Sequence, residues 1–194
     1  MKEKLKYVAN FASKMDKLHY MKKQYKRFLN QSLCLDIECA YWNGPISVIG
    51  IYKPGEGEMI CHQFVKYQNL TKENLVSAFK NCKMLITYNG LKFDVPKIRK
   101  DLPGVLPEKV FVLDLYLLAR ELNLGASLKT VENTLNIERP AHLDNRRKIA
   151  TKLWKSYTRF NNPQDLQMLL DYNRQDTVNL YPLAEALINK INVE

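Results

Sequence analysis

Four acidic residues and one tyrosine form three short patterns that are spread over most of this chain. The patterns supply Asp36 and Glu38, then Asp94, and finally Tyr172 and Asp176. Carboxylate oxygens are the hard ligands that Mg²⁺ and Mn²⁺ prefer, and they suit zinc less well. A carboxylate cage with a phenol beside it is what two-metal cleavage of a phosphodiester requires. These five residues are therefore the candidate catalytic group, and the four acids are the candidate metal ligands.

The spacing within the first and third patterns places their side chains together. Residues 33–38 have the composition of a strand, so Asp36 and Glu38 share one of its faces. Tyr172 and Asp176 are four residues apart and share one side of a helix. Each pair has an ordinary alternative, which is a solvated strand face or a local hydrogen bond. The functional interpretation therefore depends on the patterns occurring together.

The second pattern follows a short apolar stretch, at a strand end where binding sites of open α/β sheets collect. Asn89 could bond a sugar or a base, and Phe93 could stack on a base. The alternative is structural: Asn89 and Gly90 make a turn, Phe93 is core, and Asp94 caps the next helix. Taken alone, the segment favours the structural interpretation.

In this order, the three patterns resemble the motifs of the DEDD superfamily of 3′–5′ exonucleases, which are D-x-E, N-x-x-x-F/Y-D and Y-x-x-x-D. The tyrosine of the third motif corresponds to the DEDDy subgroup. Residues 127–132, 153–157 and 170–173 are also similar to the ribonuclease-H-like, YprB-type exonuclease domain. The resemblance covers about residues 31–190 and leaves out the N-terminus. Cys39 departs from it, because a threonine commonly follows the first acid pair.

The resemblance implies a role for each acid. Asp36 would bridge two divalent cations, either Mg²⁺ or Mn²⁺. Glu38 and Asp176 would complete the first metal site, and Asp94 would support the second.

The resemblance also implies that Tyr172 orients the attacking water. A phenol has a pKa of about 10, so it would aim the water rather than deprotonate it. Asn89 and Phe93 would hold the terminal nucleotide. The flanking Lys92 and Arg174 are candidate contacts to the phosphate backbone.

Positive charge is concentrated at the N-terminus. The formal net charge is +10, and residues 1–30 hold nine Lys or Arg against Glu3 and Asp16, which makes +7. Such a segment suits a polyanionic partner, although it could also be a solvated helix face. We expect residues 1–30 to form a basic helical arm that packs on the domain. The packing face would contain apolar residues at helical spacing, namely Leu5, Val8, Ala12 and Met15, together with His19.

The rest of the chain predicts one domain over residues 31–194. Strands are expected at 33–38, 46–52 and 59–65 in antiparallel order, then at 84–88 and 110–113. Helices are expected at 71–81, from 95, at 115–122, after Ser127, at 146–160 and at 163–191. This order predicts an α/β, ribonuclease-H-like mixed sheet, with three antiparallel strands, alternating helix and strand, and helices on its faces.

Composition excludes several other classes of protein. No apolar run approaches the roughly 20 residues of a membrane span, and no secretory leader is apparent. The cysteines and histidines complete no zinc pattern, and buried reduced thiols are expected for Cys34, Cys39, Cys61 and Cys82. We expect a cytoplasmic monomer that does not bind membranes.

The combined expectation is a metal-dependent 3′–5′ exonuclease that releases nucleoside 5′-monophosphates from single-stranded nucleic acid by a two-metal-ion mechanism. Its partners would be the 3′ ends of DNA or RNA, with recruitment by another DNA- or RNA-processing protein. Two alternatives stay open. One is a structure-selective endonuclease with the same carboxylate cage, and the other is a nucleic-acid-binding scaffold without turnover.

Overall fold

A five-stranded mixed sheet is the centre of the fold. The computed structural model describes residues 13–41, 43–55, 60–143 and 149–191. Its strands are β1 (Ser32–Cys39), β2 (Ile46–Tyr52), β3 (Cys61–Val65), β4 (Met84–Thr87) and β5 (Phe111–Asp114), in the spatial order β3-β2-β1-β4-β5. β1 pairs antiparallel with β2, and β2 with β3, whereas β4 and β5 continue the sheet in parallel. The predicted ribonuclease-H-like sheet is confirmed, with strand ends shifted by one or two residues.

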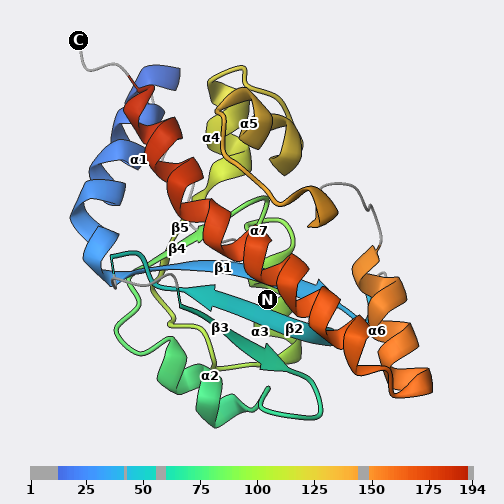
Figure 1. The fold of residues 1–194 in the computed structure, drawn as a ribbon. Helices are drawn as coiled ribbons and strands as arrows, with labels where there is room; N and C mark the ends of the chain where they lie inside the picture. Colours follow the sequence, from blue (N-terminus) through green and yellow to red (C-terminus); the bar gives the residue numbers. More distant parts are fainter. Residues whose placement is uncertain (1–12, 42, 56–59, 144–148, 192–194) are drawn as a thin grey trace.

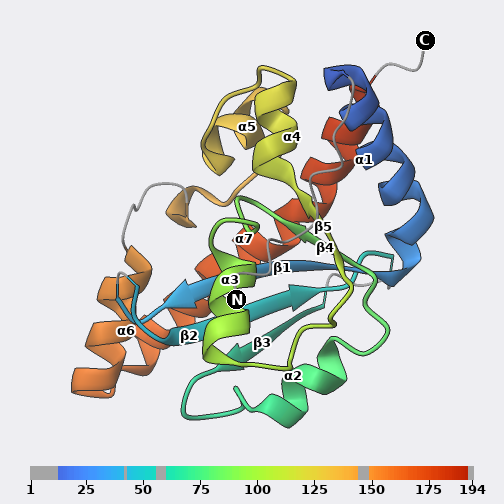
Figure 2. The ribbon, with the colours of Figure 1, turned by 180° about the vertical axis from the view of Figure 1, so that it is seen from behind.

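Helices cover both faces of this sheet. They are α1 (Lys14–Phe28), α2 (Lys72–Ala78), α3 (Asp94–Asp101), α4 (Leu115–Glu121), α5 (Leu128–Thr134), α6 (Ile149–Phe160) and α7 (Pro163–Asn189). Figure 1 shows α7 crossing one face of the sheet, with α6 near one of its ends and α1 near the other. Figure 2 gives the view from behind, in which α3 lies in front of the strands. The start of the predicted helix 146–160 lies outside the described residues.

Local hydrogen bonds fix where several helices begin. The side chains of Thr71, Asp114 and Ser127 accept the first free backbone N–H groups of α2, α4 and α5. These three helix starts were predicted from the same residues and are confirmed.

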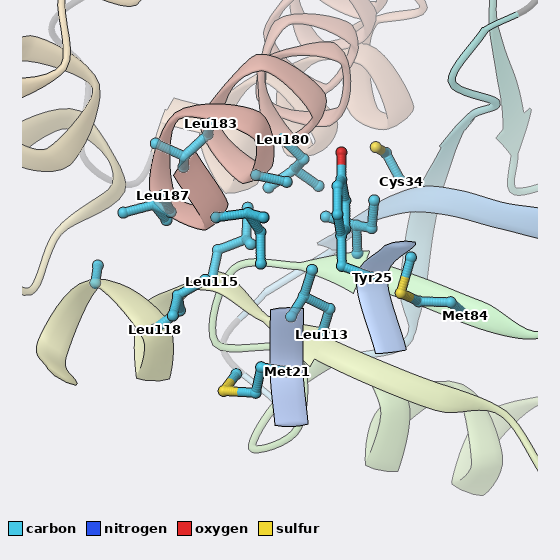
Figure 3. Close-up of a cluster of buried hydrophobic side chains, with 14 of the residues drawn as sticks. Met21, Tyr25, Cys34, Met84, Leu113, Leu115, Leu118, Leu180, Leu183 and Leu187 are labelled. Atoms are coloured by element: carbon cyan, nitrogen blue, oxygen red, sulfur yellow. The ribbon is translucent and has the colours of Figure 1, made fainter. Parts of the chain in front are cut away.

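Alternate residues of β1 face two separate cores. Leu33, Leu35 and Ile37 pack in a cluster with residues of α2 and α3. Cys34 points to the opposite face and joins a cluster with α1, α4 and α7 (Figure 3). Because side chains alternate along a strand, Asp36 and Glu38 continue the Cys34 face and lie on the side of α7.

α1 is the described part of the predicted N-terminal arm. Leu18, Met21 and Tyr25 are buried and pack this helix toward α4 and β5. Figure 3 shows Met21 and Tyr25 in this cluster. The prediction of which side of this helix packs on the domain was wrong. Met15 is 48 % exposed, and the buried residues are Leu18, Met21 and Tyr25. The other predicted apolar residues of that face, Leu5, Val8 and Ala12, lie outside the described residues.

A glycine marks the place where α7 crosses β2. Gly50 pairs with Asp36 across the two strands. A Cβ atom at Gly50 would overlap side-chain oxygens of Thr177 and Asn173, which are buried on α7. The missing side chain therefore lets α7 lie close enough to the sheet to face Asp36.

Gly50→Ala should consequently destabilise the protein and move α7. Overpacking of this kind lowers the free energy of unfolding by about 1–3 kcal/mol. Urea denaturation monitored by circular dichroism would measure the loss. Thr177→Ala in the same chain removes one of the overlapping oxygens and should recover part of the lost stability. Unchanged stability of the single variant would show that α7 has room for the methyl group.

Candidate active site

The carboxylates of Asp36, Glu38 and Asp176 come together although they are far apart in the sequence. One oxygen from each lies within 4.8 Å of the others, and all three residues are partly buried. β1 supplies the first two acids and α7 supplies the third. Three carboxylate oxygens at this separation are suited to ligating a divalent cation.

Asp94 lies beside this group without being part of it. It is the first residue of α3, is 5 % exposed, and accepts a hydrogen bond of 3.2 Å from the N–H of Ile37. That N–H is available because β4 pairs with β1 only as far as Cys34. Asp94 therefore covers the open edge of β1 between Asp36 and Glu38. Burial is the main cause that raises the pKa of both carboxyl groups, and the charge of Asp94 adds to it.

Tyr172 lies one helical turn before Asp176 on α7. Burial raises the pKa of its phenol, and the nearby charges of Asp176 and Glu38 raise it further. The phenol is therefore neutral at physiological pH. It can orient a water molecule by hydrogen bonding, but it is unsuited to removing a proton from one.

The second sequence motif forms a tight turn at the end of β4. Asn89 has a φ of 62° and donates its N–H to Asp114 Oδ1 at 2.8 Å. Leu91 donates to Oδ2 of the same carboxylate at 3.1 Å, so Asp114 organises the turn as well as capping α4. Phe93 is partly buried and packs on the α2–α3 core. The turn and the packing match the structural interpretation, and nucleotide binding by Asn89 and Phe93 stays a prediction.

Asp94 does not act as the cap of α3. Phe93 occupies the N-cap position, and no side chain bonds the free N–H groups there. The structural alternative for Asp94 was therefore wrong in this respect, because the carboxylate is directed to β1.

The two candidate phosphate contacts are both exposed. Lys92 lies in the turn before α3, and Arg174 lies on α7 between Tyr172 and Asp176. Arg174 lines a surface hollow of about 440 Å³ with Gln175, Asn179 and neighbouring residues. Both positions leave the cations accessible to a polyanion.

Sequence reasoning missed the cation that pairs with the site. Arg139, which is between α5 and α6, lies with Nη2 2.5 Å from Asp176 Oδ1 and with Cζ 5.9 Å from the centroid of the Tyr172 ring. It also forms two hydrogen bonds to Glu132, which is 1 % exposed on α5. Among the described residues, Arg139 is the one cation that forms an ion pair with a member of the three-carboxylate group, and that member is Asp176.

A buried amide holds Asp36 in place and was also missed. Asn173 Nδ2 donates to Asp36 Oδ2 at 2.9 Å, and its own Oδ1 accepts from Gln63 at 3.0 Å. Asn173 is fully buried. The available signal was a polar residue on the buried side of an apolar helix, since such groups need partners.

Burial, with crowding of the acids, raises the pKa values in this site. Burial and then the neighbouring charge of Glu38 raise the pKa of Asp36 well above its usual value. Burial and nearby carboxylates raise the pKa of Glu38 to about 8, and burial raises the pKa of Asp94 to about 7. For Asp176, burial raises the pKa to about 6 although Arg139 acts in the opposite direction. This excess of negative charge fits a divalent cation, which would relieve it.

The family model described as the RNase H superfamily matches residues 33–188. The chain belongs to the RNase H superfamily. The match includes all the acids described above, together with Tyr172, Glu132 and Arg139. A comparison with curated proteins finds no match.

This RNase H superfamily chain is also similar to two solved structures of the EXD2 exonuclease domain. In one, soaked in Mg and GMP, the identity is 18 %, the coverage is 87 % of this chain and 86 % of the other, and the TM-score is 0.32. In the other, soaked in Mn and GMP, the identity is 19 %, the coverage is 88 % and 85 %, and the TM-score is 0.29. Both likenesses are distant in sequence and in shape. None of the helices in the described parts of this chain is long and apolar enough to cross a membrane.

The raised pKa values predict an unusual dependence of stability on pH. Each carboxyl has a higher pKa in the folded protein than its value of about 4 in an unfolded chain. The folded state therefore binds more protons, and stability falls as pH rises from about 4 toward about 8. Without divalent ions, the Tm should be higher at pH 5 than at pH 8.

Thermal unfolding in a chelating buffer would measure this difference. Mn²⁺ should raise the Tm at pH 8 and reduce the difference, because ions bind the ionised carboxylates. Glu38→Gln should reduce it without added metal, since it removes one of the crowded acids. A Tm that is higher at pH 8 in the chelating buffer would contradict the prediction.

Proposed function

We propose that this chain is a metal-dependent 3′–5′ exonuclease of the DEDDy type, which releases nucleoside 5′-monophosphates from single-stranded nucleic acid. The observation that supports it most is the meeting of Asp36, Glu38 and Asp176 within 4.8 Å, with Tyr172 one turn from Asp176. Membership of the RNase H superfamily adds to this support.

The chain's own residues have distinct roles in the proposed reaction. Asp36, Glu38, Asp94 and Asp176 would hold two divalent ions, Mg²⁺ or Mn²⁺, which supply an activated hydroxide and neutralise the departing oxygen. Tyr172, as a neutral phenol, orients the attacking water.

The substrate is proposed to enter by its free 3′ end. Asn89 and Phe93, beside Asp94, would hold the terminal nucleotide. The exposed Lys92 and Arg174 would contact phosphates, and the exposed lysines of α1 would add sequence-independent attraction. The same residues would serve DNA or RNA, and the proposed active unit is a monomer.

Two other functions would use the same acids. A structure-selective endonuclease would cut internally, and a scaffold protein would bind nucleic acid without turnover. The presence of all four acids and Tyr172 favours an enzyme over the scaffold.

Digestion of end-labelled RNA and DNA in the presence of Mn²⁺ would test the proposal, with each substrate supplied as a single strand, as a duplex and with a 3′ overhang. Mononucleotide products support it, whereas internal cuts or binding alone support one of the alternatives.

Replacing an acid and replacing the tyrosine should have different effects on metal binding and turnover. Asp36→Asn removes a charge on which both proposed ions would depend, so Mn²⁺ binding and turnover should disappear together. Tyr172→Phe keeps the ring and should bind Mn²⁺ normally, while turnover falls roughly 100-fold because the water is no longer oriented. Calorimetry with Mn²⁺ and single-turnover kinetics would measure both quantities.

Two residues on α7 provide matched controls. Asp171→Asn removes a carboxylate that bonds Gln167, and Tyr181→Phe removes a phenol hydroxyl further along the helix. Both should keep metal binding and turnover. Full activity in Tyr172→Phe would show that this tyrosine only packs, and would assign the orientation of water to another group.

A substrate held by its 3′ end must have an end. A circular single strand should therefore resist digestion, whereas the linear strand of the same sequence is degraded from its 3′ terminus. Denaturing gels with both strands in one reaction would show the difference. Rapid cutting of the circle would favour the endonuclease.

A further inference from the structure

A buried ion-pair network joins the carboxylate group to a helix that carries none of its acids. Glu132 on α5 accepts hydrogen bonds from Arg139 Nε at 3.2 Å and from Arg139 Nη2 at 2.9 Å. The same Nη2 lies 2.5 Å from Asp176 Oδ1. The Arg139 and Glu132 side chains are 9 % and 1 % exposed, so this network is largely shielded from water.

Glu132 is anchored more firmly than Asp176. Asn179 donates to its Oε1 at 2.8 Å, and the amide of Asn179 is in turn held by Gln175 at 2.8 Å. A buried carboxylate without a counter-charge is strongly unfavourable, so Arg139 is kept next to Glu132. The guanidinium is consequently held beside Asp176 by a partner that lies outside the three-carboxylate group.

Asp176 Oδ1 has a different environment. It is buried, and apart from Arg139 it has no partner among the described residues. Asp36, by contrast, is bonded through Oδ2 to Asn173. Asp176 is thus the member of the three-carboxylate group whose charge is shared with a cation.

We propose that Arg139 is a built-in counter-ion of the carboxylate cage and that Glu132 sets its strength, so that this pair tunes the affinity of the cage for divalent cations. The inference rests on the metal site of the proposed function. Arg139 and Glu132 are positioning and tuning residues here, and neither is a metal ligand.

The physical reason is the sign of each charge. A cation bound at Asp176 is repelled by the nearby guanidinium, and Glu132 offsets part of this repulsion from the other side of Arg139. Nη2 of Arg139 lies 2.5 Å from Asp176 Oδ1 and 2.9 Å from Glu132 Oε1, and both side chains are largely shielded from water. In such an environment of low polarity, one charge alters binding by about tenfold or more.

Loss of the Arg139 charge and loss of the Glu132 charge should therefore change the metal affinity in opposite directions. Arg139→Gln should tighten Mn²⁺ binding by about tenfold, because it removes the repelling charge. Glu132→Gln should weaken Mn²⁺ binding by a similar factor, because the full charge of Arg139 then acts on Asp176. The double variant should return close to the affinity of the unaltered protein.

Titration calorimetry of the purified full chain with Mn²⁺ would measure these affinities without any assay of turnover. A role limited to holding the segment around Arg139 on α7 predicts another pattern. Both single variants would then lose affinity, or neither would change, and either outcome would overturn the inference. Absence of Mn²⁺ binding in the unaltered protein would instead refute the metal site itself, so the two failures can be distinguished.

Two controls separate tuning from folding. Arg139→Gln leaves Glu132 buried without its counter-charge, so circular dichroism must show that it is folded. If Arg139→Gln is not folded, Glu132→Gln and the double variant test the inference. The Mn²⁺ affinity must then fall in Glu132→Gln and recover in the double variant. Lys17→Gln breaks an ion pair of 2.7 Å with Glu121, between α1 and α4, and should leave Mn²⁺ affinity unchanged.

Discussion

The packing of α7 against the sheet is the contact on which the site depends. α7 touches β1, β2, β3 and β4, and it crosses β2 where Gly50 has no side chain. This approach brings Asp176 to the two acids of β1. It also places Asn173 against Asp36, so one helix supplies both a charge that repels Asp36 and an amide that holds it.

Concentrating acids in a partly buried place is costly for a folded protein. Burial raises the pKa values of all four acids, and the charges of the other acids raise those of Asp36 and Glu38 further, which means that the fold favours the protonated forms. Hydrogen bonds from Ile37 and Asn173 offset part of this cost, and Arg139 offsets another part. The remaining excess of negative charge would suit a divalent cation, which the three carboxylates could hold.

Local sequence signals predicted the elements well, because their causes are local. Thr71, Asp114 and Ser127 begin helices by bonding N–H groups two or three residues away. The packing face of α1 was predicted less well. Met15 and Leu18 are both apolar residues of one helix, and only the positions of α4 and β5 decide which of them is covered.

The sequence by itself determined the strand that aligns Asp36 with Glu38 and the helix that aligns Tyr172 with Asp176, because the periods of strands and helices are properties of the backbone. The tertiary structure decided which distant residues meet these pairs. Asp94 is directed to the edge of β1, and Arg139 is shared between Glu132 and Asp176. Such contacts arise from the packing of α3, α5 and α7 around the sheet, and no periodicity along one chain encodes them.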